Sequence, residues 1–299
     1  MDSAKPLISV IIPTFNSERT IRQCLDSILQ QDYNRFEIIA VDGGSMDETI
    51  KILNDARVKI IHSKRNITGY NRQLGVVNST GDIIAFIDAD VILPDRSWLK
   101  RMLNQLMILM TQDNNVVAIS SLWRHSREEK GAVRYVALYL KFILRRNGIL
   151  RDEDFLRTSN WGTGMTLILK RAINDVGGFN CNIHYYDDSE ISSRMVSNGN
   201  IFILSTNNYN SVIHLQVDNF TDYLRKFYLI SVLGARQFGG ELKLAREIAS
   251  IPWSVLCMVK EISRNRDHIW MIHPVLQVAR SFIRSLVLMR YTTCELPSR

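Results

Sequence analysis

Two carboxylates, Asp88 and Asp90, follow an apolar run at residues 83–87 that has the composition of a buried strand. Side chains at the carboxyl end of a parallel strand face the crevice where ligands bind in open α/β sheets. Carboxylates at this spacing suit Mg²⁺ or Mn²⁺, which commonly binds one or two of them together with substrate phosphate oxygens. Such a metal would neutralise a diphosphate and stabilise it as a leaving group. A polar turn after a strand is the alternative interpretation.

A second acidic group contains Asp187, Asp188 and Glu190 within four positions. Mutual repulsion between neighbouring carboxylates raises the pKa of at least one of them. A positioned carboxylate can remove the proton from a hydroxyl as the hydroxyl attacks, which is general base catalysis. The structural alternative is an acidic helix N-terminus that the helix dipole favours.

Strand-like and helix-like patterns alternate along the first part of the chain, which predicts a mostly parallel α/β sheet flanked by helices. We expect strands at 7–12, 36–41, 58–61 and 83–87, with helices after Ser17, after Ser45 and at 71–78. Ser45 and Glu48 have the spacing of a capping box. Asp42 ends the second strand, and Gly43 and Gly44 after it would let backbone approach a ligand closely.

The second half of the chain is less regular until about residue 219, where the pattern becomes helical throughout. Strands are expected at 116–120, 166–169, 201–204 and 211–214, and helices at 132–146 and 187–197. Periodicity and charge both change near residue 218, so we place a domain boundary there.

The net charge of +7 lies entirely in the last quarter of the chain. From Arg225 onward there are 12 Lys and Arg against 5 Asp and Glu, whereas residues 1–224 carry 25 of each sign. The basic side chains there are interleaved with apolar ones; the two sets are Lys260, Arg264, Arg266, Arg280, Arg284 and Arg290, and Trp253, Trp270, Ile272, Phe282, Ile283 and Leu286. This pattern is typical either of helices that contact an anionic membrane surface or of packed helices with a solvated basic face, and we hypothesise the membrane contact. No nucleic-acid-binding motif accompanies the charge.

The location expected for the protein is cytoplasmic, with peripheral attachment to the cytoplasmic face of the membrane. The four cysteines are scattered without Cys-x-x-Cys spacing, which suits a reducing compartment. No uncharged apolar stretch reaches the roughly 18 residues that a spanning helix needs.

Four ordered segments resemble the family 2 glycosyltransferases, which have the GT-A fold. They are Ser-Val-Ile-Ile-Pro-Thr-Phe-Asn at 9–16, Val-Asp-Gly-Gly-Ser-Met-Asp at 41–47, Gly-Asp-Ile-Ile-Ala-Phe-Ile-Asp-Ala-Asp at 81–90, and Gly-Gly-Phe followed by Tyr-Asp-Asp-Ser-Glu within 177–190. The resemblance covers roughly residues 7–194. It implies transfer of a sugar, with inversion, from a nucleotide-diphosphate sugar donor to a hydroxyl acceptor with the help of Mg²⁺ or Mn²⁺.

The resemblance also implies roles for individual residues. The donor would be bound by Pro13, Thr14, Asn16, Asp42, Arg72 and Asp88, and the metal by Asp90, Asp88 and His214. Asp188 would be the general base, with Asp187 beside it. Gly43 and Gln73 depart from the residues that many members carry, which leaves the choice of donor open. Trp161 could stack on an acceptor ring, and a buried core position is the alternative.

We therefore expect a GT-A catalytic domain at 1–218, with a nucleotide-sugar-binding half at 1–115 and an acceptor-binding half at 116–218. A basic helical extension would follow at 219–299. The acceptor would be a glycan or a lipid-linked molecule.

Two other functions fit parts of the pattern. A metal-dependent phosphoryl-transfer enzyme can also place Asp-x-Asp after a strand, although such phosphatases continue with Gly-Thr where this chain has Val91 and Ile92. A sugar-nucleotide-binding scaffold without turnover is the non-enzymatic alternative. A dinucleotide-dependent oxidoreductase is excluded because no Gly-x-Gly-x-x-Gly follows the first strand.

Overall fold

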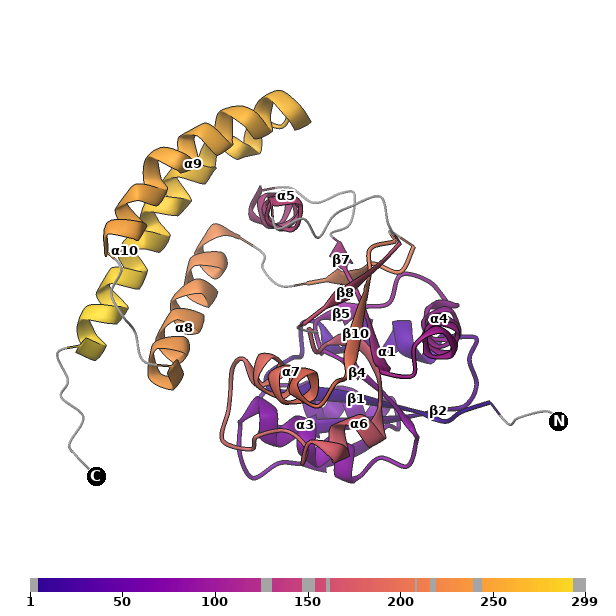
Figure 1. Cartoon of the computed structure of the whole chain (residues 1–299). Helices are drawn as coiled ribbons and strands as arrows, with labels where there is room; N and C mark the ends of the chain where they lie inside the picture. Colours follow the sequence, from indigo (N-terminus) through magenta and orange to yellow (C-terminus); the bar gives the residue numbers. More distant parts are fainter. Residues whose placement is uncertain are drawn as a thin grey trace. The chain divides into compact units, whose positions relative to one another are not determined.

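The computed structural model describes residues 5–124, 131–146, 154–159, 162–207, 209–215, 219–238 and 244–292 (Figure 1). The chain divides into two compact units. Unit 1 comprises Met1–Ser126 and Ile143–Leu215, and unit 2 comprises Arg127–Phe142 and Gln216–Arg299. The expected boundary at 218 lies close to this division, but the division assigns most of the helix near residue 140 to the C-terminal unit and not to the acceptor-binding half.

An eight-stranded sheet in the order β3-β2-β1-β4-β9-β6-β10-β8 forms the centre of unit 1. Its strands are β1 (Ile8–Thr14), β2 (Phe36–Asp42), β3 (Lys59–His62), β4 (Ile83–Ile87), β6 (Val116–Ser121), β8 (Phe155–Thr158), β9 (Met165–Leu169) and β10 (Ile201–Ser205). β1 to β4 pair in parallel, as do β6 and β10, whereas β8 and β9 run antiparallel to their neighbours. The mostly parallel α/β architecture predicted from the sequence is confirmed.

Helices cover both faces of this sheet. They are α1 (Ile21–Leu29), α2 (Thr49–Asp55), α3 (Thr68–Val77), α4 (Trp98–Gln112), α6 (Lys170–Asp175) and α7 (Asp187–Ser197). Figure 1 shows α3 and α6 on one side of β1, and α1 and α4 on the other. The predicted capping box is wrong: the Ser45 hydroxyl donates to Asp42, and the Thr49 N–H at the start of α2 donates to Asp47 Oδ1 at 3.0 Å.

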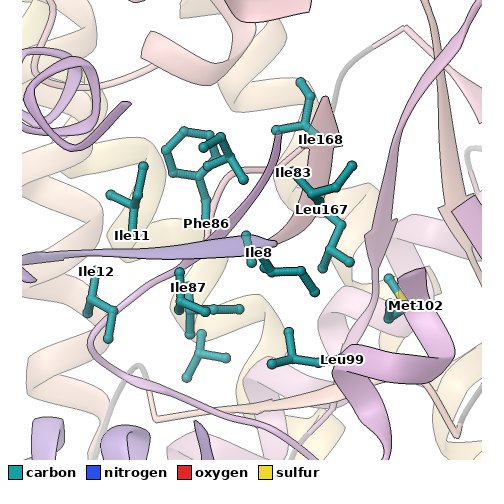
Figure 2. Close-up of a cluster of buried hydrophobic side chains, with 14 of the residues drawn as sticks. Ile8, Ile11, Ile12, Ile83, Phe86, Ile87, Leu99, Met102, Leu167 and Ile168 are labelled. Atoms are coloured by element: carbon teal, nitrogen blue, oxygen red, sulfur yellow. The ribbon is translucent and has the colours of Figure 1, made fainter. Parts of the chain in front are cut away.

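The central strands are buried on both faces, which explains their continuous apolar sequences. Ile11 and Phe86 lie on one side of β1, and Ile12 and Ile87 lie on the other (Figure 2). α3 approaches the first side closely, since a Cβ added at Gly75 would lie 2.4 Å from Ile11 Cγ2. This packing fixes the carboxyl ends of β2, β1 and β4 as neighbours along one edge of the sheet.

A second sheet of three short strands stands beside the end of β4. Its order is β5-β11-β7, with β5 at Val91–Ile92, β11 at Val212–His214 and β7 at Trp123–Arg124. β11 pairs antiparallel to β5, so that His214 lies opposite Val91. A residue far along the chain is thereby brought to the segment that directly follows Asp90.

Unit 2 is helical. It contains most of α5 (Gly131–Arg146), then α8 (Phe220–Phe238), α9 (Leu244–Asn265), the 3-10 turn η1 (His268–Ile272) and α10 (His273–Thr292). α10 packs against α8 and α9. The core of unit 2 is aromatic, and a chain of ring contacts links Tyr135, Tyr139, Phe142, Trp270 and His273. Among the residues described, no helix has the length and apolar character that crossing a membrane requires.

Candidate active site

Asp42, at the end of β2, is almost completely buried and held by four hydrogen bonds. Oδ1 accepts from Thr14 Oγ1 at 3.2 Å and from the Ser45 hydroxyl, while Oδ2 accepts from the N–H groups of Gly44 and Ser45, each at 2.9 Å. A carboxylate has about four lone-pair sites, so its accepting capacity is filled by the protein. A nucleotide base that hydrogen-bonds to Asp42 would have to displace one of these donors.

Asn16 joins the end of β1 to the loop that follows β2. Its backbone is left-handed, with φ +47°, and its Oδ1 accepts from the Met46 N–H at 2.9 Å. The Asn16 N–H donates to Ser45 Oγ, also at 2.9 Å. Pro13 is half-buried one residue before Thr14. The donor-binding residues expected on β1 and β2 therefore lie together and shape one loop.

Arg72, on α3, reaches two carboxylates from distant parts of the chain. Nη1 donates to Asp187 Oδ2 at 2.6 Å, and Nη2 donates to Asp88 Oδ1 at 3.0 Å. Burial lowers the pKa of Arg72, but the charges of Asp187 and Asp88 outweigh burial and the pKa rises. The resemblance predicted that Arg72 faces the donor; its observed partners are these two acids.

Asp188 stands at the start of α7, next to Asp187. Asp187 is buried and engaged by Arg72, whereas Asp188 is only half-buried. Burial raises the pKa of Asp188; the charge of Arg72 opposes this rise, and that of Asp187 adds to it. The residue before the pair, Tyr186, is left-handed at φ +63°, an unfavourable conformation that tends to be retained at functional sites.

Asp88, at the end of β4, is in close contact with the backbone of Gly164. The Asp88 N–H donates to the Gly164 carbonyl at 3.2 Å, and a Cβ added at Gly164 would lie 2.2 Å from Asp88 Oδ2. Gly164 also has φ +104°, a conformation that side-chain-bearing residues rarely adopt. No sequence pattern connects these two residues.

Replacing Gly164 with Ala should therefore move Asp88 and strain the backbone. We expect a loss of roughly 1–3 kcal/mol in unfolding free energy, measured by chemical denaturation. Gly162→Ala is the matched control, because an added Cβ at Gly162 meets nothing within 4 Å. Its effect should stay within about 0.5 kcal/mol. Equal stability of the two variants would contradict the close approach at Gly164.

Asp90 pairs with His214, the residue that the small sheet brings to it. His214 Nε2 lies 2.9 Å from Asp90 Oδ1, and the Leu215 N–H donates to the Asp90 carbonyl at 2.8 Å. The Trp123 ring packs edge-on against the imidazole at 5.6 Å. The other ring nitrogen, His214 Nδ1, is buried and has no hydrogen-bond partner. Two of the three predicted metal ligands are thus in contact.

The described ranges contain no cluster of three His, Cys, Asp or Glu side chains that could hold a metal ion. Asp88 contributes to the charge near Asp90 but has Arg72 as its partner. Burial raises the pKa of Asp88, Arg72 opposes the rise, and Asp90 adds to it. A divalent ion that takes one or two protein ligands plus diphosphate oxygens needs no such cluster, so Asp90 and His214 have suitable chemistry for it.

Trp161, the expected acceptor platform, lies outside the described residues. The remaining predicted site residues lie at the carboxyl ends of β1, β2 and β4, on α3, at the start of α7 and at the end of β11. These residues comprise metal-binding oxygens, a buried cation and a half-buried carboxylate.

Residues 9–177 match the family model described as Glycosyl transferase family 2. That match covers more than half of the chain, and the chain belongs to glycosyl transferase family 2. Asp42, Arg72, Asp88 and Asp90, whose contacts are described above, all lie within this matched segment.

Individual relatives are more distant. The chain is 35% identical over 118 residues to an uncharacterized glycosyltransferase of Haemophilus influenzae, covering 36% of this chain and 47% of that protein. It is 28% identical over 240 residues to a PGL/p-HBAD biosynthesis glycosyltransferase of Mycobacterium tuberculosis, covering 78% of this chain and 88% of that protein. For three curated relatives, the Haemophilus influenzae protein among them, the matched region spans only 26 to 47% of the relative's length.

Among solved structures, the chain resembles the mannosyltransferase PcManGT from Pyrobaculum calidifontis in complex with GDP-Man and Mn²⁺. The TM-score is 0.63 at 17% identity, over 96% of this chain and 88% of that one. At this identity the likeness concerns the fold, which is the expected GT-A type.

Proposed function

We propose that the protein is an inverting glycosyltransferase that moves a sugar from a nucleotide-diphosphate sugar to an acceptor hydroxyl. The observation that carries the proposal is the separation of two acidic groups by Arg72. Arg72 Nη2 donates to Asp88, which lies two residues before Asp90 and has groups suited to a metal and diphosphate nearby. Arg72 Nη1 donates to Asp187, which is followed by the half-buried carboxylate of Asp188. Membership of the family supports the same reaction.

On the donor side, Asp90 and His214 would hold Mg²⁺ or Mn²⁺, with Asp88 close by. The metal, when bound, neutralises the diphosphate as it departs. Thr14, Asn16 and the loop at 43–46 would line the nucleotide. The solved relative that contains Mn²⁺ and GDP-Man supports a metal and a nucleotide sugar as partners.

On the acceptor side, Asp188 would take the proton of the acceptor hydroxyl. The acceptor oxygen bonds to the anomeric carbon as the bond from that carbon to the diphosphate breaks on the opposite face. One such displacement inverts the configuration. Asp187 is held by Arg72 and would position α7 without taking up this proton.

The acceptor in this proposal is a glycan or a lipid-linked molecule, and the enzyme works in the cytoplasm. The positive charge of the C-terminal quarter supports attachment to an anionic membrane surface, where a lipid-linked acceptor would be found. Nucleic acid is not a partner in this proposal.

A screen of nucleotide sugars by titration calorimetry with Mn²⁺ or Mg²⁺ tests the donor side. We expect one donor to bind only with metal, and Asp90→Ala to weaken that binding at least roughly tenfold. Asp82→Ala is the matched control, because Asp82 is an exposed acid just before the opposite end of β4. Its donor affinity should equal that of the wild type.

One result would refute the proposal, and two others would support a different function. Absence of binding to every donor by the folded wild type would refute the proposal. Phosphate release from phosphorylated substrates would support the phosphoryl-transfer alternative. Donor binding without transfer to any glycan or lipid-linked acceptor would support the scaffold.

A further inference from the structure

α10, together with the turn before it, exposes a line of large apolar side chains. They are Met271, Val275, Val278, Phe282 and Leu286. Their spacing of three or four residues places them on one face of a helix. The opposite face, with Leu276 and Arg280, is buried within unit 2. The exposed line therefore does not belong to the core of the unit.

α9, which packs against α10, has the same organisation. Trp253, Leu256 and Val259 are exposed, with Leu256 at 68% of its accessible surface, whereas Cys257 and Glu261 are buried. Two neighbouring helices thus each expose apolar side chains, and among these Trp253 also contacts the ring of Phe142 in the aromatic core. We call these eight residues of α9, η1 and α10 the apolar face.

The exposed charges of unit 2 have one sign in the part that the structure describes. The exposed charged residues are Arg134, Arg225, Lys226, Lys260, Arg264, Arg266 and Arg284. Of the acids whose burial is described, Glu261 is buried, and Asp222 and Asp267 are partly buried. The structure also corrects the sequence analysis, because Trp270 and Arg280 are buried and cannot contact a partner.

We propose that the apolar face docks onto the surface of an anionic lipid bilayer, with the basic residues of unit 2 contacting the headgroups. Large aliphatic and aromatic side chains gain free energy by leaving water for the acyl boundary. Long basic side chains such as Lys260 and Arg264 can keep their charges at headgroup level while their stems cover apolar surface. The inference rests on the membrane attachment given in the proposed function and deepens it, because it names the residues of unit 2 that would contact the bilayer.

Two other occupants fit less well. A second copy docked face to face would bring two sets of basic side chains together, and no acid of unit 2 whose burial is described is exposed to pair with them. Nucleic acid would satisfy the basic side chains but not the aliphatic ones. An anionic bilayer is complementary to both.

Sedimentation of the full chain with vesicles tests the proposal, using phosphatidylcholine alone or with phosphatidylglycerol. We expect binding to the mixed vesicles, weak binding to the neutral ones, and a decrease as salt is raised. The double variant Val275→Glu, Phe282→Glu should lower the partition coefficient at least roughly tenfold. Lys260→Gln with Arg264→Gln should lower it less and reduce the salt dependence.

The matched control is Met107→Glu with Ile108→Glu, two exposed apolar residues of α4 in unit 1. It adds the same charge and should bind vesicles as the wild type does, and circular dichroism should show that all variants are folded. Failure of the wild type to bind would overturn the proposal. Equal vesicle binding by the apolar-face variant Val275→Glu, Phe282→Glu and by the control variant of α4 would also overturn it. So would dimerisation in the absence of lipid that Val275→Glu, Phe282→Glu abolishes. The vesicles contain neither donor nor acceptor, so these outcomes leave the proposed transfer reaction unaffected.

Discussion

The variant Asp188→Asn should transfer sugar with a kcat roughly 10²- to 10⁴-fold below the wild-type value, because the amide cannot take the acceptor proton. The KM for the donor should change little, because Asp188 is not among the residues proposed to bind the donor. Initial rates with the donor identified by calorimetry would measure both quantities. Retention of more than a tenth of the wild-type kcat would place the base elsewhere.

Glu190→Gln is the matched control for this variant. Glu190 belongs to the same acidic group but is paired with Arg194 through two hydrogen bonds, at 2.7 and 2.8 Å. Its neutralisation removes a charge from the same helix turn without touching the proposed base. We expect its kcat to stay within about threefold of the wild type, because Glu190 is paired with Arg194 and takes no part in the proposed proton transfer.

The pH dependence follows from the raised pKa of Asp188. Transfer requires the ionised form, so the wild-type rate should fall on acidification through a pKa above the usual range for Asp.

The contribution of Asp188 to the free energy of unfolding depends on pH in the opposite direction. A raised folded-state pKa contributes stability below the unfolded-state pKa, and this contribution is lost as pH rises through the folded-state pKa. At neutral pH, Asp188→Asn should therefore unfold at the wild-type temperature or above it.

The variant Arg72→Met should lose roughly 3–5 kcal/mol of unfolding free energy, the largest stability effect that we expect in this protein. The substitution removes the cation between Asp88 and Asp187, and Asp187 is then a buried carboxylate without its partner. Chemical denaturation would measure the loss. Adding Asp187→Asn should recover part of it, because the unpaired buried charge is then removed as well.

Arg157→Met is the comparison for Arg72→Met. Arg157 also pairs with an aspartate, Asp113, at 2.9 Å, but its side chain is 68% exposed. Its loss should change stability by about 0–1 kcal/mol. If the two Met variants were equally stable, the bridge at Arg72 would not be formed in solution.

Much of the fold could be predicted because the signals are local. Apolar runs identified β1, β2 and β4, and the acids at the ends of β2 and β4 indicated one edge of the sheet. α7 begins and ends at the predicted residues. α4 was not predicted, although its buried residues have helical spacing. The pattern for this helix is therefore present in the sequence and was overlooked.

The contacts that complete the candidate site could not be predicted in the same way. Arg72 and Asp187 are 115 positions apart, and no local pattern connects them. The approach of Gly164 to Asp88 depends on how β9 pairs with β4. His214 was identified by resemblance, but its contact with Asp90 depends on a sheet whose strands contain two or three residues. Such short strands carry too few residues for a periodic pattern.

The bridge from Arg72 has a consequence for how enzymes of this kind could be recombined. It joins a helix of the expected donor half to the first turn of a helix in the expected acceptor half. A chimera that exchanged one half at residue 115 would inherit a guanidinium from one parent and its carboxylate from the other. Only parents that share this pair could exchange halves without leaving a buried charge alone. Modular exchange of donor and acceptor preference is therefore constrained by one ion pair.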